Sequence, residues 1–134
     1  MSSIYLLTRV RDERYAFPVH AVREVARALE VTPVPGAPPA VLGVHNLRGE
    51  VVPVLELAPL LGLAGADADC VIVAEDGGRR AGLTVDELLD VRQLPSELEI
   101  AEAPLAGSTL LDGELGGVVD VRAVFDAIEE TTRR

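Results

Sequence analysis

Short aliphatic runs alternate with polar turns along this chain, and the strongest example spans residues 41–61. Two runs rich in Val and Leu flank Arg48-Gly49 there, and a glycine-centred turn between such runs is typical of a β-hairpin. Pro53 lies in the second run, which predicts an edge strand or a bulge, because proline cannot donate a ladder hydrogen bond. The hairpin presents Arg48 at its tip. A solvated turn residue is the simpler interpretation of this arginine, and a contact residue is the alternative.

The segment before this hairpin contains the same kind of short elements. Residues 4–10 and 15–17 are strand-like and are joined by a charged turn. Pro18 is a favourable start for a helix, and valines at every third position over residues 19–25 predict one face of a short helix. The chain then looks extended up to residue 32, and the prolines within residues 33–39 predict an irregular connection.

This arrangement occurs twice in the sequence. The hairpin segment matches the end of the chain at an offset of 64 residues, and the segment before it matches at an offset of 66. The matched pairs include Gly43 with Gly107, Leu47 with Leu111, Gly49 with Gly113, Glu50 with Glu114, Val54 with Val118, Glu56 with Asp120 and, at the second offset, Leu6 with Ile72, Val19 with Val85, Val22 with Leu88 and Val25 with Val91. Asp112 takes the place of Arg48 at the tip of the second hairpin.

The repeat predicts a mainly β protein. We expect one domain, residues 1–134, with two similar halves at roughly 1–66 and 67–134, each holding about five short strands and two short helices. Short strands in small units favour curled, barrel-like sheets, and a half of ~66 residues is marginal alone. The halves should therefore share a hydrophobic core and leave a groove at their seam. Residues 121–130 are amphipathic and predict a C-terminal helix over one barrel end.

Composition restricts the possible partners. The formal net charge of −10 opposes binding to nucleic acid or to an anionic membrane surface. The longest apolar tract, residues 51–66, is broken by prolines and a glutamate and is too short to span a bilayer. The N-terminus has no signal-peptide pattern, and the single cysteine, Cys70, lies in an apolar run typical of a buried thiol. These features fit the cytoplasm.

The chain offers little catalytic chemistry. His20 and His45 have no cysteine, histidine or carboxylate at ligand spacing, so we expect no metal site. No glycine-rich phosphate loop follows a strand, and no serine lies in a nucleophile elbow. Glu56 and Asp120 lie just before predicted helices, where a carboxylate can cap the helix N-terminus, and we expect both to be caps. We therefore predict a protein that is not an enzyme and needs no cofactor.

The remaining candidates are contact residues. They are Val22, Glu24 and Val25 after the short helix, Asn46, Arg48 and Gly49 in the first hairpin, and Ala81, Gly82 and Val85 in the second half. Gly43 and Gly82 lack a side chain where a strand usually packs one, which allows a backbone to approach closely, from a partner or from the chain itself. A β-bulge is the structural alternative for each glycine.

Four runs of the sequence together resemble the CheW family, the adaptors of bacterial chemotaxis arrays. They are YAFPVHAVREV, TPVPGAPPAVLGVHNLRGEVVPVLEL, AGLTVDELLDV and LLDGELGGVVDV, and the resemblance extends from Ile4 to about Ala127. It implies two intertwined five-stranded SH3-like β-barrels around a shared core, which agrees with the repeat. The sequence departs from the family pattern at His45, where Ile, Val or Thr is usual, and at Glu56, where Asp is usual.

The resemblance implies a scaffold without catalytic activity. Such an adaptor couples the cytoplasmic tip of a methyl-accepting chemoreceptor to the regulatory domain of the histidine kinase CheA, and it reaches the membrane only through the receptor. The family positions carried over to this chain are Val22 and Glu24 for kinase and receptor contact, Asn46 and Arg48 for receptor coupling, and Gly43, Gly82 and Val85 for the groove that receives the receptor hairpin. A structural role for Arg48, bracing the hairpin, remains the alternative.

A second function class is a small-molecule sensor. Its ligand would lie between the barrels, with His45 or Glu56 supplying polar contacts. A cavity of ~300 Å³ or more lined by those residues would support this hypothesis, whereas a filled seam would count against it.

Overall fold

The computed structural model describes residues 2–27, 29–65, 68, 70–95, 98–99, 101–111 and 113–132. Its elements are β1 (Ser2–Val10), β2 (Glu13–Pro18), the 3₁₀ helix η1 (Val19–Ala21), β3 (Val22–Arg27), β4 (Val41–Leu47), β5 (Glu50–Leu55), α1 (Leu57–Leu60), β6 (Cys70–Asp76), β7 (Arg79–Val85), β8 (Glu87–Pro95), β9 (Leu105–Leu111), β10 (Glu114–Val119) and α2 (Val121–Thr132). The prediction of a mainly β chain with short helices and a C-terminal helix is confirmed. The prediction for Asp112 concerns a residue outside the described ones.

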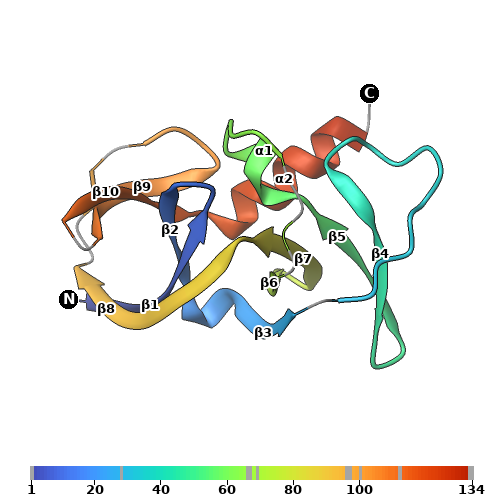
Figure 1. Ribbon diagram of the computed structural model, residues 1–134, viewed down its shortest axis with the longest axis horizontal. Helices are drawn as coiled ribbons and strands as arrows, with labels where there is room; N and C mark the ends of the chain where they lie inside the picture. The colour runs from blue at the N-terminus through green and yellow to red at the C-terminus, as the bar shows by residue number, and fades with distance from the viewer. Residues whose placement is uncertain are drawn as a thin grey trace.

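The ten strands form two five-stranded sheets that lie side by side (Figure 1). The first sheet, with the order β8-β1-β2-β10-β9, is on the left of the view, and the second, β3-β6-β7-β5-β4, is on the right. Each sheet takes strands from both halves of the sequence. Because β1 to β5 match β6 to β10 in the repeat, the two strand orders are equivalent, and the halves are intertwined.

Both sheets close into barrels through equivalent backbone bridges. In the second sheet, Thr32 and Val44 exchange hydrogen bonds of 2.8 and 2.9 Å, and in the first sheet Glu99 and Ser108 exchange two of 2.9 Å. Gly43 lies directly beside the first bridge. A Cβ atom on Gly43 would lie 2.7 Å from the carbonyl carbon of Thr32 and closer still to its oxygen. Gly107, the repeat partner of Gly43, is similarly crowded by the backbone of Glu99.

A single apolar core joins the two barrels. It combines residues of the first sheet, such as Leu6 and Phe17, with residues of the second, such as Ile72 and Leu83, and Phe125 of α2 also belongs to it. Tyr5, Leu7, Ala16, Leu94, Leu111 and Val118 form a smaller buried cluster inside the first barrel. The seam between the barrels is therefore filled by side chains, as a shared core requires.

The predicted helix over residues 19–25 is wrong beyond Ala21. Val19–Ala21 form a single 3₁₀ turn, and Val22 already begins β3. Half-buried and exposed residues alternate along β3, with the period of two that strands show. Valines three apart fit a helical turn and would lie on opposite faces of a strand, but pairing of β3 with β6 favours the strand.

The prediction that the strand with Pro53 lies at a sheet edge is wrong, because β5 lies between β7 and β4. Parallel pairing of β5 with β7 runs only through Val54 and Leu55, so the proline lies just outside the ladder that it would interrupt. The bulge of this hairpin is in β4 instead, where the register shifts between Val41 and Gly43.

Of the two predicted helix caps, one is confirmed and one is wrong. The Asp120 side chain accepts a 3.1 Å hydrogen bond from the Ala123 backbone N–H and so caps α2. Glu56 makes no such bond to α1. The Leu57 N–H donates instead to the Thr84 hydroxyl, and the Glu56 carboxylate packs against Gly65. Glu56 thus faces away from α1, whose third residue, Pro59, has no N–H for a side-chain cap to bind.

We expect Asp120→Ala to lower the free energy of unfolding by about 1 kcal/mol, the usual cost of a lost helix cap. The matched variant is Glu56→Ala, which removes the equivalent carboxylate but no helix cap. Urea unfolding of both variants checks this difference. Equal midpoints for the two variants would contradict the assigned cap roles.

Candidate functional site

The tip of the β4–β5 hairpin is a two-residue turn with both residues in the left-handed region. Arg48 has φ +51° and Gly49 has φ +89°. This is the type I′ geometry that matches the twist of a hairpin, and it usually selects Asn, Asp or Gly. The Asn46 side chain accepts a 2.8 Å hydrogen bond from the Gly49 N–H. Asn46 and Gly49 therefore build the turn, whereas Arg48 is an unfavourable residue for it.

The Arg48 guanidinium reaches across to β3, where it forms a two-point ion pair with Glu24. Its Nη1 and Nη2 lie 3.1 and 3.3 Å from the two carboxylate oxygens. The Arg48 side chain is nevertheless 78% exposed, against 26% for Glu24. β3 and β4 are the outer strands of the second sheet in its strand order, so barrel closure is what brings these side chains together.

His45 contributes to the same closure. Its Nδ1 lies 2.7 Å from the Glu30 carbonyl oxygen. A carbonyl can only accept, so Nδ1 carries the proton. His45 thus ties β4 to the chain that follows β3 and has a structural role.

The other candidate contact residues of β3 face in different directions. Val22 is half-buried and packs against the shared core, whereas Val25 is 36% exposed. Because side chains alternate along a strand, Val25 points to the face opposite Glu24. On the hairpin, Val51 is 65% exposed and pairs with Asn46. The structure thus gathers Glu24, Asn46, Arg48 and Val51 into one patch, which we call the tip surface.

The predicted groove residues have packing roles within the described part of the chain. Val85 is fully buried in the shared core, and Gly82 is buried inside the second barrel, where a Cβ atom would lie 2.7 Å from Val71 Cγ1. Gly43 is closed off by Thr32, as described above. Ala81 is also buried, and it lies beneath a hollow beside α2. The close approach at Gly43 and Gly82 therefore comes from the chain itself.

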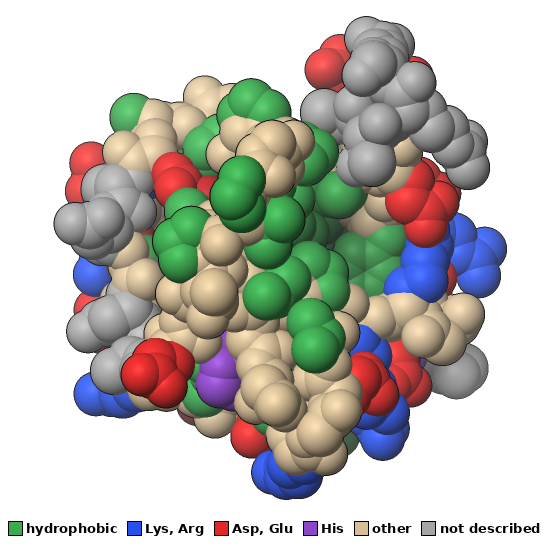
Figure 2. Space-filling view, turned by 90° about the vertical axis from the view of Figure 1, so that its right-hand side faces the viewer, with side chains coloured by type: hydrophobic (Ala, Val, Ile, Leu, Met, Phe, Trp, Pro, Cys, Tyr) green, Lys and Arg blue, Asp and Glu red, His purple; other side chains and the backbone are tan. Residues whose placement is uncertain are grey.

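The end of the molecule formed by β4 and its preceding connection is largely apolar. Figure 2 shows hydrophobic side chains gathered over this face, and Val34 and Leu42 are 43% and 40% exposed. The prolines within residues 33–39 predicted only an irregular connection and did not indicate this face. The run of prolines and valines before β4 was the available signal.

The small-molecule hypothesis finds no support in the geometry. The seam where its ligand would lie is filled by the shared core. His45 is bonded to a backbone carbonyl, and Glu56 packs against Gly65. Across the described residues, no three His, Cys, Asp or Glu side chains are grouped so that they could hold a metal ion. In the same part of the chain, every helix is too short or too polar to cross a membrane.

Comparison with known proteins matches this chain to the family model described as a CheW-like domain, over residues 5–129. The chain belongs to the CheW family. It is 32% identical to the chemotaxis protein CheW of Rhizobium meliloti, with 90% of this chain and 86% of that protein covered. It is also 33% identical to CheW of Thermotoga maritima, over 89% of this chain and 85% of that one. Protein FrzA of Myxococcus xanthus is 36% identical over 82% of this chain and 70% of its own length.

The fold agrees with this assignment. The crystal structure of the scaffolding protein TtCheW from Thermoanaerobacter tengcongensis superposes with a TM-score of 0.81 at 24% identity, covering 89% of this chain and 84% of that one. The CheW-like domain is a chemotaxis adaptor and not an enzyme, and this chain shares that role.

Proposed function

We propose that this CheW-like chain works in the cytoplasm and couples the cytoplasmic tip of a methyl-accepting chemoreceptor to the regulatory domain of the histidine kinase CheA. The observation that carries the proposal is an arginine held in left-handed backbone at an exposed hairpin tip. Its contact partners are proposed to be other proteins of the chemosensory array.

The fold itself gains little from an arginine at position 48. A left-handed backbone at a residue with a Cβ costs about 1–2 kcal/mol. An exposed ion pair such as Arg48–Glu24 stabilises the fold by only about 0.2–1 kcal/mol. Unfavourable backbone conformations of this kind cluster at functional sites, where the side chain is needed for something other than stability. Arg48 is therefore proposed to serve a partner, with Glu24 holding its guanidinium in place.

The remaining candidates are assigned around this centre. Val22, Glu24, Val25, Asn46 and Gly49 are proposed to belong to the kinase and receptor contacts. Gly43, Ala81, Gly82 and Val85 are proposed to shape the walls of the receptor groove from within, because all four are buried. We expect contacts of modest size, near the ~800 Å² per partner of a standard interface.

The proposal is tested by using the tagged chain as bait in the native cytoplasm. We expect it to recover a histidine kinase together with a chemoreceptor. Recovery of neither protein, under conditions that preserve a known receptor–kinase complex, would contradict the proposed coupling.

A further inference from the structure

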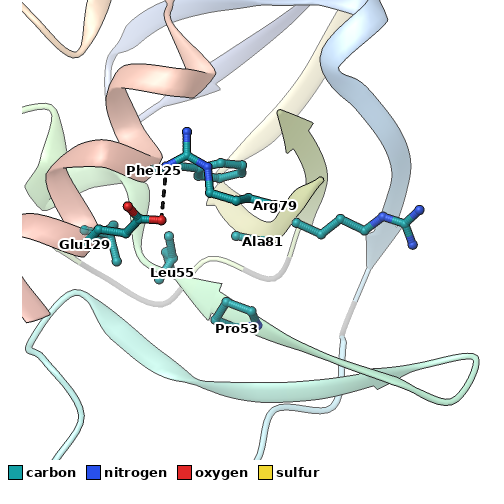
Figure 3. Close-up of a pocket in the computed structure, with 8 residues that line it drawn as sticks. Pro53, Leu55, Arg79, Ala81, Phe125 and Glu129 are labelled. Carbon is teal, nitrogen blue, oxygen red and sulfur yellow. Dashed lines mark hydrogen bonds and ion pairs between the residues drawn. The ribbon is translucent and has the colours of Figure 1, made fainter. Parts of the chain in front are cut away.

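The shared core opens to solvent between β5, β7 and α2. A hollow of about 150 Å³ lies there, lined by Pro53, Leu55, Ala81, Phe125 and Ile128, with Arg79, Arg80 and Glu129 around it. Figure 3 shows Pro53 and Leu55 on one side and Ala81 and Phe125 on the others, with Arg79 and Glu129 joined by an ion pair at the rim. Its lining is mostly apolar. A dry cavity of about this size lined by Leu, Ile and Phe is large enough to take a benzene ring.

The repeat identifies what fills the equivalent place in the other barrel. Ala81 corresponds to Tyr15 at the offset of 66, and the strand registers agree, because Ala81 pairs with Ala74 as Tyr15 pairs with Thr8. The ring of Tyr15 is only 4% exposed. It lies against Gly117, where an added Cβ atom would be 3.1 Å from Tyr15 Cδ1. The space that an aromatic ring of the chain occupies in the first barrel is thus left open by an alanine in the second.

We propose that this hollow binds a tyrosine side chain of a partner protein, presented on a segment with flanking Lys or Arg residues. Tyr15 shows how the hydroxyl of such a side chain finds a hydrogen-bond acceptor, since it donates a 2.6 Å hydrogen bond to the Glu13 carboxylate. Glu129 places a carboxylate at the rim of the hollow. A carboxylate accepts several hydrogen bonds, so the pair with Arg79 leaves Glu129 able to accept one more.

Charge around the hollow favours basic flanks. Arg79 pairs with Asp126 and Glu129 at 2.9 and 3.1 Å, and Arg80 pairs with Glu50 at 3.4 Å and with Glu75. Three of the acidic side chains stand further out than the arginines, because Asp126, Glu129 and Glu50 are 61%, 49% and 52% exposed while the two arginines are 31% and 33% exposed. Glu75 lies deeper, at 27% exposed. The whole chain carries −10. The outermost charged side chains around the hollow, which a partner meets first, are therefore negative. This inference does not rest on the proposed function, because it holds whichever protein brings the ring.

The test is a methyl NMR titration of the full chain with three probes. These are p-cresol, which is the tyrosine side chain alone, and the blocked tripeptides Lys-Tyr-Lys and Glu-Tyr-Glu. We expect saturable shifts at the methyl groups of Leu55, Ala81 and Ile128. The basic tripeptide should bind about two- to fivefold more tightly than the acidic one, and 0.5 M NaCl should remove the difference.

Two variants test whether p-cresol binds in this hollow. Ala81→Tyr repeats the arrangement of Tyr15 and should abolish p-cresol binding without loss of thermal stability. Ile128→Glu changes a half-buried wall residue of α2 and should weaken p-cresol about tenfold, even if the first variant does not fold. Leu110→Glu, at a 68% exposed site of the first barrel, is the control and should bind p-cresol normally. Absence of saturable binding, or equal binding by Ile128→Glu and the unaltered chain, would overturn the proposal.

Discussion

Reversal of the charge at the hairpin tip, as Arg48→Glu, is expected to reduce co-sedimentation with receptor–kinase complexes about tenfold or more while the chain stays folded. The variant places a second carboxylate beside Glu24 and removes the exposed cation of the tip surface. Loss of one member of a charge pair buried at an interface costs about 2–5 kcal/mol of binding free energy. The fold should lose only about 1 kcal/mol, because the ion pair is exposed.

Arg122→Glu is the matched control for this charge reversal. Arg122 is 72% exposed, close to the 78% of Arg48, and it also makes an ion pair, with Asp76 at 3.4 Å. Arg122 lies at the start of α2, beside Asp76 at the end of β6. We expect Arg122→Glu to co-sediment with receptor–kinase complexes as the unaltered chain does. If Arg48→Glu assembles as well as Arg122→Glu, Arg48 is not part of an interface.

A methyl group at Gly43 is expected to cost the fold about 3 kcal/mol, near the upper end for overpacking of a well-packed site. The added Cβ atom of Gly43→Ala would overlap the Thr32 carbonyl and lie 2.8 Å from Val31 Cγ1. Relief of this overlap requires the bridge between Thr32 and Val44 to open, and that bridge closes the second barrel. Urea unfolding should therefore show a much lower midpoint.

Gly36→Ala separates the steric effect from backbone strain. Gly36 also has a positive φ, +79°, but an added Cβ atom there would meet nothing within 4 Å. We expect this control to lose about 1 kcal/mol from strain alone. A Gly43→Ala variant that is as stable as Gly36→Ala but fails to bind receptor would show that Gly43 contacts the partner directly.

The repeat explains why so much of this fold could be predicted from the sequence. Matching of Gly43 with Gly107 anticipated two positions that the structure uses in the same way, each beside a bridge that closes a barrel. The C-terminal helix also begins at Val121 as predicted, because Asp120 caps it and its apolar residues recur at helical spacing.

The failures come from interactions that the local sequence does not contain. Glu56 matches Asp120 in the repeat, yet α1 ends after four residues and a threonine from β7 takes the first N–H. Val85 lies at the end of an apolar run, between Thr84 and Asp86, and the pairing of β7 with β6 is what places it in the shared core. The pair between Arg48 and Glu24 joins outer strands that meet only when the sheet curls closed.

The most direct test of the central claim keeps the turn and removes only the arginine. Arg48→Asn introduces a residue that tolerates the left-handed backbone, so the hairpin should remain as stable as before. Arg11→Asn is its control, because Arg11 is also a left-handed arginine, with φ +56°, but lies in the β1–β2 turn against Asp86. Binding of purified receptor tip and CheA regulatory domain should fall about tenfold for Arg48→Asn and stay unchanged for Arg11→Asn. Unchanged binding by Arg48→Asn would contradict the claim that Arg48 serves a partner.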